Sequence, residues 1–152
     1  MTPALLREKV ISERILWIRE MMAGLRSLPL ESLDAFRSDA RNTASAESYL
    51  RRALEALLDL GRHILAKGFG NAVPEYKEVA KALLKFGVIG PKESDKLRIL
   101  AGYRNRMVHF YHEISDLEIY EICTRELGDV EAILSKIINW INNHPAKIDK
   151  SL

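Results

Sequence analysis

Cysteine is nearly absent from this chain: Cys123 is the only one among 152 residues. A single cysteine can form neither a disulfide within the chain nor a cysteine-based zinc site. The fold must therefore be stabilised without covalent cross-links, which suits the reducing interior of a cell. We expect a cytoplasmic protein.

Long apolar runs and a strong charge of one sign are missing as well. No apolar stretch approaches the roughly 20 residues that a membrane-spanning helix needs. The first predicted helix carries charged residues where a signal peptide has an apolar core. The net charge is only +2, so any binding of RNA would depend on a local basic patch. We expect no membrane partner.

Strand signals are also lacking. No segment alternates apolar and polar residues with period two, and no Asn-Gly or Asp-Gly turn occurs. Apolar residues recur instead every three to four positions, which is typical of amphipathic helices. This spacing predicts five helices, at about residues 5–26, 39–67, 75–86, 92–108 and 116–142, with a linker at 30–38 that has room for a helical turn at Leu33–Phe36.

This pattern predicts an all-α fold with a single domain over residues 1–152. We expect an antiparallel up-and-down four-helix bundle, with the helix at 75–86 as an additional short helix and a polar tail from about residue 144. In the last helix the apolar spacing alternates three and four without a break, so an unbroken helix should lie beside the helix at 92–108. Ser115 and Glu118 form a capping-box pattern at its start.

The stretch Gly102–Tyr111 combines residue types that can handle a phosphate and a proton. On a helix, Arg104 falls within the apolar stripe that contains Leu97, Ala101 and Val108. A guanidinium keeps its charge and is costly to bury unpaired. Arg104 therefore needs an anion, an interface or a water-filled cleft, and His109 and Tyr111 follow it closely.

Helix geometry argues against Arg104 and His109 acting together on one phosphate. Arg104 and His109 are five positions apart, so an unbroken helix would point them roughly 140° apart. They can meet on one phosphate if the helix breaks near Val108 or if two chains pool their residues. From spacing alone, the alternative is an exposed helix end with a surface histidine and a packed tyrosine.

Other chemistries have weaker support in the sequence. His109, His112 and Glu113 form H-x-x-H-E, which is not the H-E-x-x-H order of a zinc protease, and no third ligand is suitably spaced. We predict no metal site and no cofactor. The glycine pairs lack the Lys-Ser/Thr of a phosphate-binding loop. His63, beside an apolar stripe, is expected to be a packed or surface residue.

The stretch resembles the HEPN superfamily, specifically its HepT-like toxin branch. Arg104, Asn105, His109 and Tyr111 match the pattern R-x4-H-x-Y, with asparagine directly after the arginine; Phe110 stands where the branch often has a polar residue. The resemblance extends over nearly the whole chain, including Leu60–Lys67, Val73–Tyr76, Gly87–Ile89 and Tyr111–Tyr120.

The resemblance implies a homodimer whose two motifs face each other across a shared cleft. It implies a metal-independent endoribonuclease acting on tRNA or mRNA, with Arg104 and His109 catalytic and Asn105 a supporting polar residue. It also implies a partner, a minimal nucleotidyltransferase antitoxin that attaches AMP to Tyr111. The chain has no Gly-Ser dipeptide of the nucleotidyltransferase signature, so it would be the substrate of that modification.

This chemistry is physically consistent. RNA carries its own nucleophile, the 2′-hydroxyl. A histidine can accept that proton or donate one to the leaving oxygen, and an arginine can stabilise the charge that grows on the phosphate. Two other interpretations remain open: a non-catalytic helical module that binds a nucleotidyltransferase or a nucleotide, and a purely structural bundle.

Overall fold

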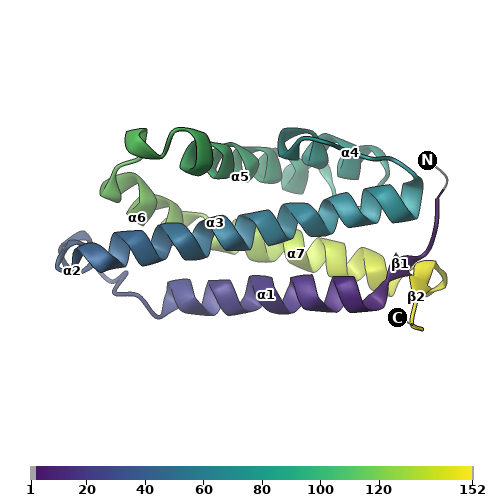
Figure 1. Ribbon diagram of the computed structural model, residues 1–152, viewed down its shortest axis with the longest axis horizontal. Coiled ribbons are helices and arrows are strands. Elements are labelled where there is room, and N and C mark those ends of the chain that lie inside the picture. The colour runs from purple at the N-terminus through teal and green to yellow at the C-terminus, as the bar shows by residue number, and fades with distance from the viewer. Residues whose placement is uncertain (1–2, 152) are drawn as a thin grey trace.

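The chain is built almost entirely from helices (Figure 1). The computed structural model describes residues 3–151, apart from the side chain of Tyr111. The α-helices are α1 (Glu8–Arg26), α2 (Leu33–Arg37), α3 (Ala40–His63), α4 (Val79–Lys85), α5 (Pro91–His109), α6 (Asp116–Arg125) and α7 (Leu127–Asn142). A π-helical turn at Ile64–Gly68 extends α3, and 3-10 turns occupy Tyr76–Glu78, Tyr111–Glu113 and Pro145–Lys147. The predicted all-α class is confirmed.

Four long helices, α1, α3, α5 and α7, form the body of the molecule and run in alternating directions (Figure 1). The most extensive contact is between α1 and α3, and α5 packs against α4, α3 and, as predicted, α7. The short helix α4 lies beside α5, and α2 lies at the end of the bundle where α3 begins. None of the helices in residues 3–151 is both long and apolar enough to cross a membrane.

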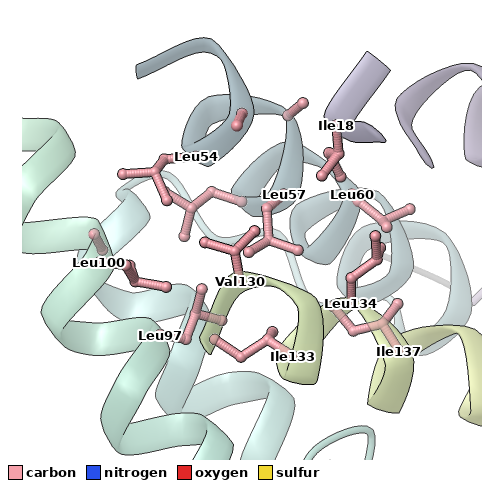
Figure 2. Packing of buried hydrophobic residues seen from close by; sticks show 14 of the residues in the cluster. Ile18, Leu54, Leu57, Leu60, Leu97, Leu100, Val130, Ile133, Leu134 and Ile137 are labelled. Carbon is pink, nitrogen blue, oxygen red and sulfur yellow. The ribbon is translucent and has the colours of Figure 1, made fainter. Parts of the chain in front are cut away.

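The core lies where the buried faces of these four helices meet (Figure 2). The side chains labelled there come from α1, α3, α5 and α7: Ile18, Leu54, Leu57, Leu60, Leu97, Leu100, Val130, Ile133, Leu134 and Ile137. Fully burying one such side chain stabilises a fold by about 1.5–3 kcal/mol. This packing fixes the helix ends that carry the polar residues described below.

Local hydrogen bonds define where several helices begin. Ser38 and Asp39 are both of a type that can cap α3, and it is the carboxylate of Asp39 that accepts the backbone N–H of Arg41. At the start of α5, Pro91 occupies the first turn and the side chain of Glu93 accepts the N–H of Gly90 at 3.0 Å. The predicted helical turn in the linker is confirmed as α2.

The predicted unbroken helix at 116–142 is wrong, because the chain leaves helical geometry at Glu126 and divides into α6 and α7. Glu126 has φ −106° and ψ −6°, and its N–H still bonds to the carbonyl of Ile122 at 2.9 Å. Gly128 follows closely and weakens the local preference for helix. The apolar spacing continues across the break, so the sequence pattern gives no sign of it.

The ends of the described chain also differ from the prediction. Leu6–Arg7 (β1), predicted within the first helix, pairs in parallel with Ile148–Asp149 (β2), predicted within the polar tail. Leu6 is fully buried, and Ile148 packs against the core. Each strand has two residues, which is too short for a period-two pattern to show in the sequence.

Candidate functional site

Three of the motif residues, Arg104, Asn105 and His109, line a cleft of about 510 Å³ at the C-terminal end of α5. Its lining comes from three elements, namely the end of α3, the segment before α4 and the end of α5: Arg62, Pro74, Glu75, Tyr76, Lys77, Arg104, Asn105, His109 and Phe110. A larger groove of about 710 Å³ between α1 and α7 contains no motif residue and no histidine. The cleft at α5 is therefore the candidate site.

Arg104 has an anion, an aromatic ring and the cleft as neighbours. Its Nε lies 3.5 Å from Oε1 of Glu55 on α3, and its Nη1 donates to Oδ1 of Asn105 at 3.2 Å. The guanidinium carbon lies 4.6 Å from the centre of the Tyr76 ring, a cation–π contact. The side chain is 20% exposed, so the charge predicted to need a partner has one and still reaches the cleft.

The contact between Arg104 and Glu55 is an ion pair without hydrogen-bond geometry. Nε of Arg104 is buried, and it makes no hydrogen bond within the described part of the chain, although the carboxylate is close. Glu55 also accepts a hydrogen bond from Nη1 of Arg51 at 3.0 Å. Its negative charge is therefore shared between two arginines, which leaves Arg104 only partly neutralised.

Tyr76 supports Arg104 from the 3-10 turn before α4. Its hydroxyl donates to Oδ1 of Asp59 at 2.6 Å. Burial, and then the hydrogen bond to this carboxylate, raises the pKa of Tyr76 to about 12. The ring is therefore a neutral, anchored surface at neutral pH, against which the Arg104 guanidinium rests.

His109 is the last residue of α5, and the helix continues without a break up to it. A break near Val108, one of the two conditions under which these residues could meet, does not occur, because the helix ends only at Phe110, which has φ −131° and ψ 36°. Arg104 and His109 nevertheless line the same cleft within one chain. The angle between the two side chains on a continuous helix therefore does not prevent them from lining the same cleft.

Two neighbouring positions depart from the expected pattern. Val108, predicted within the buried stripe, is 37% exposed, while Met107 is buried in its place. The last turn of α5 lies at the margin of the core, where only one side of the helix still packs. Phe110 is 50% exposed and lines the cleft.

Tyr111 begins a 3-10 turn directly after this point. Its side chain lies outside the described residues, so the predicted position of its ring beside the cleft stays a prediction.

The end of α5 is tied to α6 by an ion pair between Arg106 and Glu118. The pair is bidentate: Nη1 bonds to Oε1, and Nη2 donates to Oε2 at 3.0 Å. Ser115 caps α6 by accepting the N–H of Glu118 at 3.1 Å. The predicted capping box is thus only half formed, because the Glu118 carboxylate pairs with an arginine and charge-assisted bidentate bonds are the stronger option.

Within residues 3–151 no three histidine, cysteine or acidic side chains are grouped so that they could hold a metal ion. His112 and Glu113 form a contact at 3.9 Å. His63, far from these residues in sequence, accepts the backbone N–H of Arg7 on Nε2 at 3.2 Å and is half-buried, as a packed histidine should be.

Arg104, Asn105 and His109, which the sequence places in one motif, line the cleft together, whereas nothing in the sequence marks Glu55, Asp59 or Tyr76 as their neighbours. The two carboxylates lie on α3 and resemble ordinary exposed positions of a helix. Tyr76 appeared only within the stretch that resembles the toxin branch. No spacing rule connects residues from such distant segments, so only the tertiary packing reveals that Glu55 and Tyr76 contact Arg104 and that Asp59 holds Tyr76.

Known proteins are similar to this chain in sequence and in fold. The profile of the family described as Ribonuclease HepT-like matches residues 9–137. The tRNA nuclease HepT of Aphanizomenon flos-aquae (strain 2012/KM1/D3) is 25% identical over 111 residues, which cover 73% of this chain and 76% of that protein.

Two solved structures are similar in fold. A tri-AMPylated HEPN toxin of Shewanella oneidensis, in complex with MNT antitoxin, has a TM-score of 0.77 at 22% identity and covers 86% of this chain and 97% of its own. The cytosolic protein YutE of Bacillus subtilis, of unknown function, has a TM-score of 0.76 at 17% identity, covering 92% and 94%. With the family profile spanning most of the sequence, the chain belongs to the HepT-like ribonuclease family.

Proposed function

We propose that this protein is an endoribonuclease toxin that cleaves RNA, either tRNA or mRNA, through the substrate's own 2′-hydroxyl and without a metal ion. The observation that carries the proposal is the cleft in which Arg104 and His109 lie together in a HepT-like chain. The similarity to a protein named tRNA nuclease HepT supports RNA as the substrate.

His109 is the proposed general acid and base. It ends α5 and is exposed on the cleft, so a nucleotide can approach its ring. Imidazole can remove the proton of the 2′-hydroxyl and donate one to the leaving 5′-oxygen near neutral pH. The nucleophile and the leaving group both come from RNA, so a metal-bound water is not needed.

Arg104 is the proposed stabiliser of the negative charge that develops on the phosphate. Its position is fixed in advance by Glu55, Asn105 and the Tyr76 ring, and fixed donors lower the barrier because they need no reorganisation during the reaction. Glu55 does not line the cleft and is shared with Arg51. A phosphate that accepts two parallel hydrogen bonds from the guanidinium can therefore compete with Glu55 for it.

We also propose that the protein acts as a homodimer in the cytoplasm. Two copies with facing clefts would surround one RNA strand with two arginines and two histidines. The exposed Val108 and Phe110 beside the motif would lose contact with water in such a dimer, which favours association. A single species with the mass of a monomer in sedimentation at micromolar concentration would count against this arrangement.

The proposed partner is a minimal nucleotidyltransferase antitoxin that attaches AMP to Tyr111. The fold is shared with HEPN toxins that were solved in complex with MNT antitoxin, one of them tri-AMPylated. A phosphodiester on Tyr111 would add negative charge and bulk close to Arg104 and His109. It would then compete with the RNA phosphate for the arginine and repel the strand.

The test is RNA cleavage by the purified chain in EDTA. Wild type should cleave and should leave products ending in a 2′,3′-cyclic phosphate. Arg104→Ala and His109→Ala should each abolish cleavage with an unchanged circular dichroism spectrum. His112→Ala, at a neighbouring histidine whose side chain is 67% exposed, is the matched control and should cleave like wild type. The mechanism would be refuted if cleavage depended fully on a divalent metal, or if it persisted without His109. An inactive wild type that still binds a nucleotidyltransferase would instead indicate a non-catalytic module.

A further inference from the structure

The Tyr76 ring carries a second arginine contact that the proposed reaction does not use. The guanidinium carbon of Arg62 lies 5.2 Å from the centre of the ring, against 4.6 Å for Arg104. The two guanidinium groups are therefore separated by no more than the sum of these distances. Arg62 lies in the last turn of α3 and Arg104 lies on α5, so one aromatic ring contacts cations from two helices.

Arg62 forms only a long ion pair within the chain. Its Nη1 lies 3.8 Å from Oδ1 of Asp59, at the outer limit of an ion pair. The same oxygen of Asp59 also accepts the Tyr76 hydroxyl at 2.6 Å, so Asp59 interacts more closely with Tyr76 than with Arg62. The Arg62 side chain is 40% exposed and lines the cleft, so it is available to a ligand.

The charges that line the cleft favour an anion. Arg62, Lys77 and Arg104 are the basic residues of the lining, whereas Glu75 is the one carboxylate among the described lining residues. Glu75 already pairs with Lys77 at 3.2 Å. The remaining positive charge is thus concentrated on the two arginines that contact Tyr76. The whole chain has a net charge of only +2, so RNA binding would depend on a local group of cations such as these arginines.

We propose that Arg62 forms a second phosphate-binding position next to Arg104 and that Tyr76 is the positioning residue for both guanidinium groups, an inference that rests on the proposed action on RNA. Arg104 binds the phosphate that is cleaved. Arg62 binds a neighbouring phosphate of the same strand and fixes the register of the RNA in the cleft. A planar guanidinium is suited to this role because it can form two parallel hydrogen bonds with one phosphate.

Tyr76 can position both arginines because it is itself held at both ends. The hydroxyl is fixed to Asp59, which lies one helical turn before Arg62 on α3. The ring contacts Arg62 and Arg104. A cation that rests on an ordered ring loses little rotamer freedom when a phosphate binds. Loss of the ring should therefore weaken both arginines, and loss of the hydroxyl alone should have a smaller effect.

RNA binding separates the role of Arg62 from catalysis. The experiment measures the affinity of a short, fluorescent, single-stranded RNA of mixed sequence for the non-cleaving His109→Ala chain over a range of salt concentrations. Adding Arg62→Gln should raise Kd about tenfold at low salt and reduce the slope of log Kd against log salt by about 0.7, the value for one lost phosphate contact on a single strand. Arg62→Lys keeps the charge and should recover most of the slope.

Arg26→Gln is the matched control. Arg26 also pairs with a carboxylate, Glu131, and its side chain is 48% exposed, but it lies on α1 away from the cleft. Its removal deletes the same charge and should leave the slope unchanged. Arg62→Gln and Arg26→Gln with equal Kd and slope would overturn the inference while leaving the proposed cleavage intact.

Cleavage kinetics test the role of Tyr76. In the otherwise wild-type chain, Arg62→Gln should raise KM with little change in kcat. Tyr76→Leu should raise KM and lower kcat, and Tyr76→Phe, which keeps the ring, should recover most of both. A Tyr76→Phe variant as impaired as Tyr76→Leu would show that the hydroxyl and not the ring matters, which contradicts the positioning role.

The outcomes also separate this inference from the proposed function. A wild-type chain that cleaves no RNA, but whose affinity and salt slope fall with Arg62→Gln, would refute the nuclease and retain the phosphate-binding position. A His109→Ala chain that does not bind RNA at any salt concentration would overturn both.

Discussion

Gly61 sets the distance between α3 and α4, and replacing it tests the packing that holds the wall of the cleft. A methyl group at Gly61 would lie 2.8 Å from Cγ1 of Val79 and 3.1 Å from Cδ1 of Leu83. Both side chains are fully buried, and valine is stiff about χ1. We expect Gly61→Ala to push α4 away from α3 or to strain Val79.

The size of the effect follows from two opposing contributions. Overpacking a core by one methyl group costs about 1–3 kcal/mol. Alanine gains about 0.8–1 kcal/mol over glycine from helix propensity. Gly61→Ala should therefore lower the free energy of unfolding by about 0–2 kcal/mol.

Gly102 on α5 provides the matched control, because a methyl group there meets nothing within 4 Å in the described chain. Gly102→Ala should raise stability by about 0.8–1 kcal/mol. Since both variants gain the same propensity, the difference between them isolates the overpacking and should be about 1–3 kcal/mol.

The measurement is urea unfolding followed by circular dichroism, supported by thermal melts. For a chain of this size, 1 kcal/mol shifts Tm by roughly 2–4 °C. Combining Gly61→Ala with Val79→Ala should give less than the sum of the two losses, because the second change removes the clashing atom. A Gly61→Ala variant as stable as Gly102→Ala would refute the close approach of the two helices.

Three further predictions concern single side chains. Burial lowers the pKa of His63 from its usual 6.5, and neutral His63 accepts the N–H of Arg7. As the pH falls, the unfolded chain therefore takes up a proton before the folded chain does, and the free energy of unfolding should decrease below about pH 6.5. This decrease should be smaller in His63→Gln. An equal pH dependence of the two chains in urea titrations would contradict this prediction. The Cys123 thiol is buried, which raises its pKa to about 12, so it should resist iodoacetamide in the native chain and react in urea, and rapid native labelling would show otherwise. Co-expression with a cognate nucleotidyltransferase should add mass in units of AMP to Tyr111 and end RNase activity. Tyr111→Phe should keep part of the activity and should not be inactivated by the nucleotidyltransferase. Unmodified Tyr111 in the neutralised complex would favour simple steric blocking of the cleft by the bound antitoxin.

The helices could be predicted because burial repeats locally along the chain. Leu97, Leu100 and Ala101 are buried at the spacing that the sequence shows, and Asp39 caps α3 from its own segment. The break at Glu126 could not be predicted, because α6 and α7 bury the same continuing stripe on either side of it. A periodic pattern reports which face is buried and is insensitive to a short interruption that preserves this face.

The candidate site was predictable only as far as one helix extends. Arg104, Asn105 and His109 lie within two turns of α5, but helix spacing alone would point Arg104 and His109 apart, so their shared cleft was expected only from the resemblance of this stretch to the HEPN superfamily. Glu55 and Tyr76 reach Arg104 through tertiary packing, and nothing in their own neighbourhood marks them. The sequence indicated that Arg104 needs a partner, while the identity of that partner depends on how α3, α4 and α5 are packed.

The parallel pair of β1 and β2 sets how the chain would respond to a pulling force. A tether fixed before Leu6 and another fixed after Asp149 would pull two strands that run in the same direction from their opposite ends. The hydrogen bonds between the strands would then be loaded in shear and would share the force. Because α1 follows β1 directly and α7 comes shortly before β2, the pulling force would not reach either helix until the hydrogen bonds between the two strands break. In a single-molecule force experiment, the first event should be the abrupt release of a few residues at each end, before any helix of the bundle unwinds.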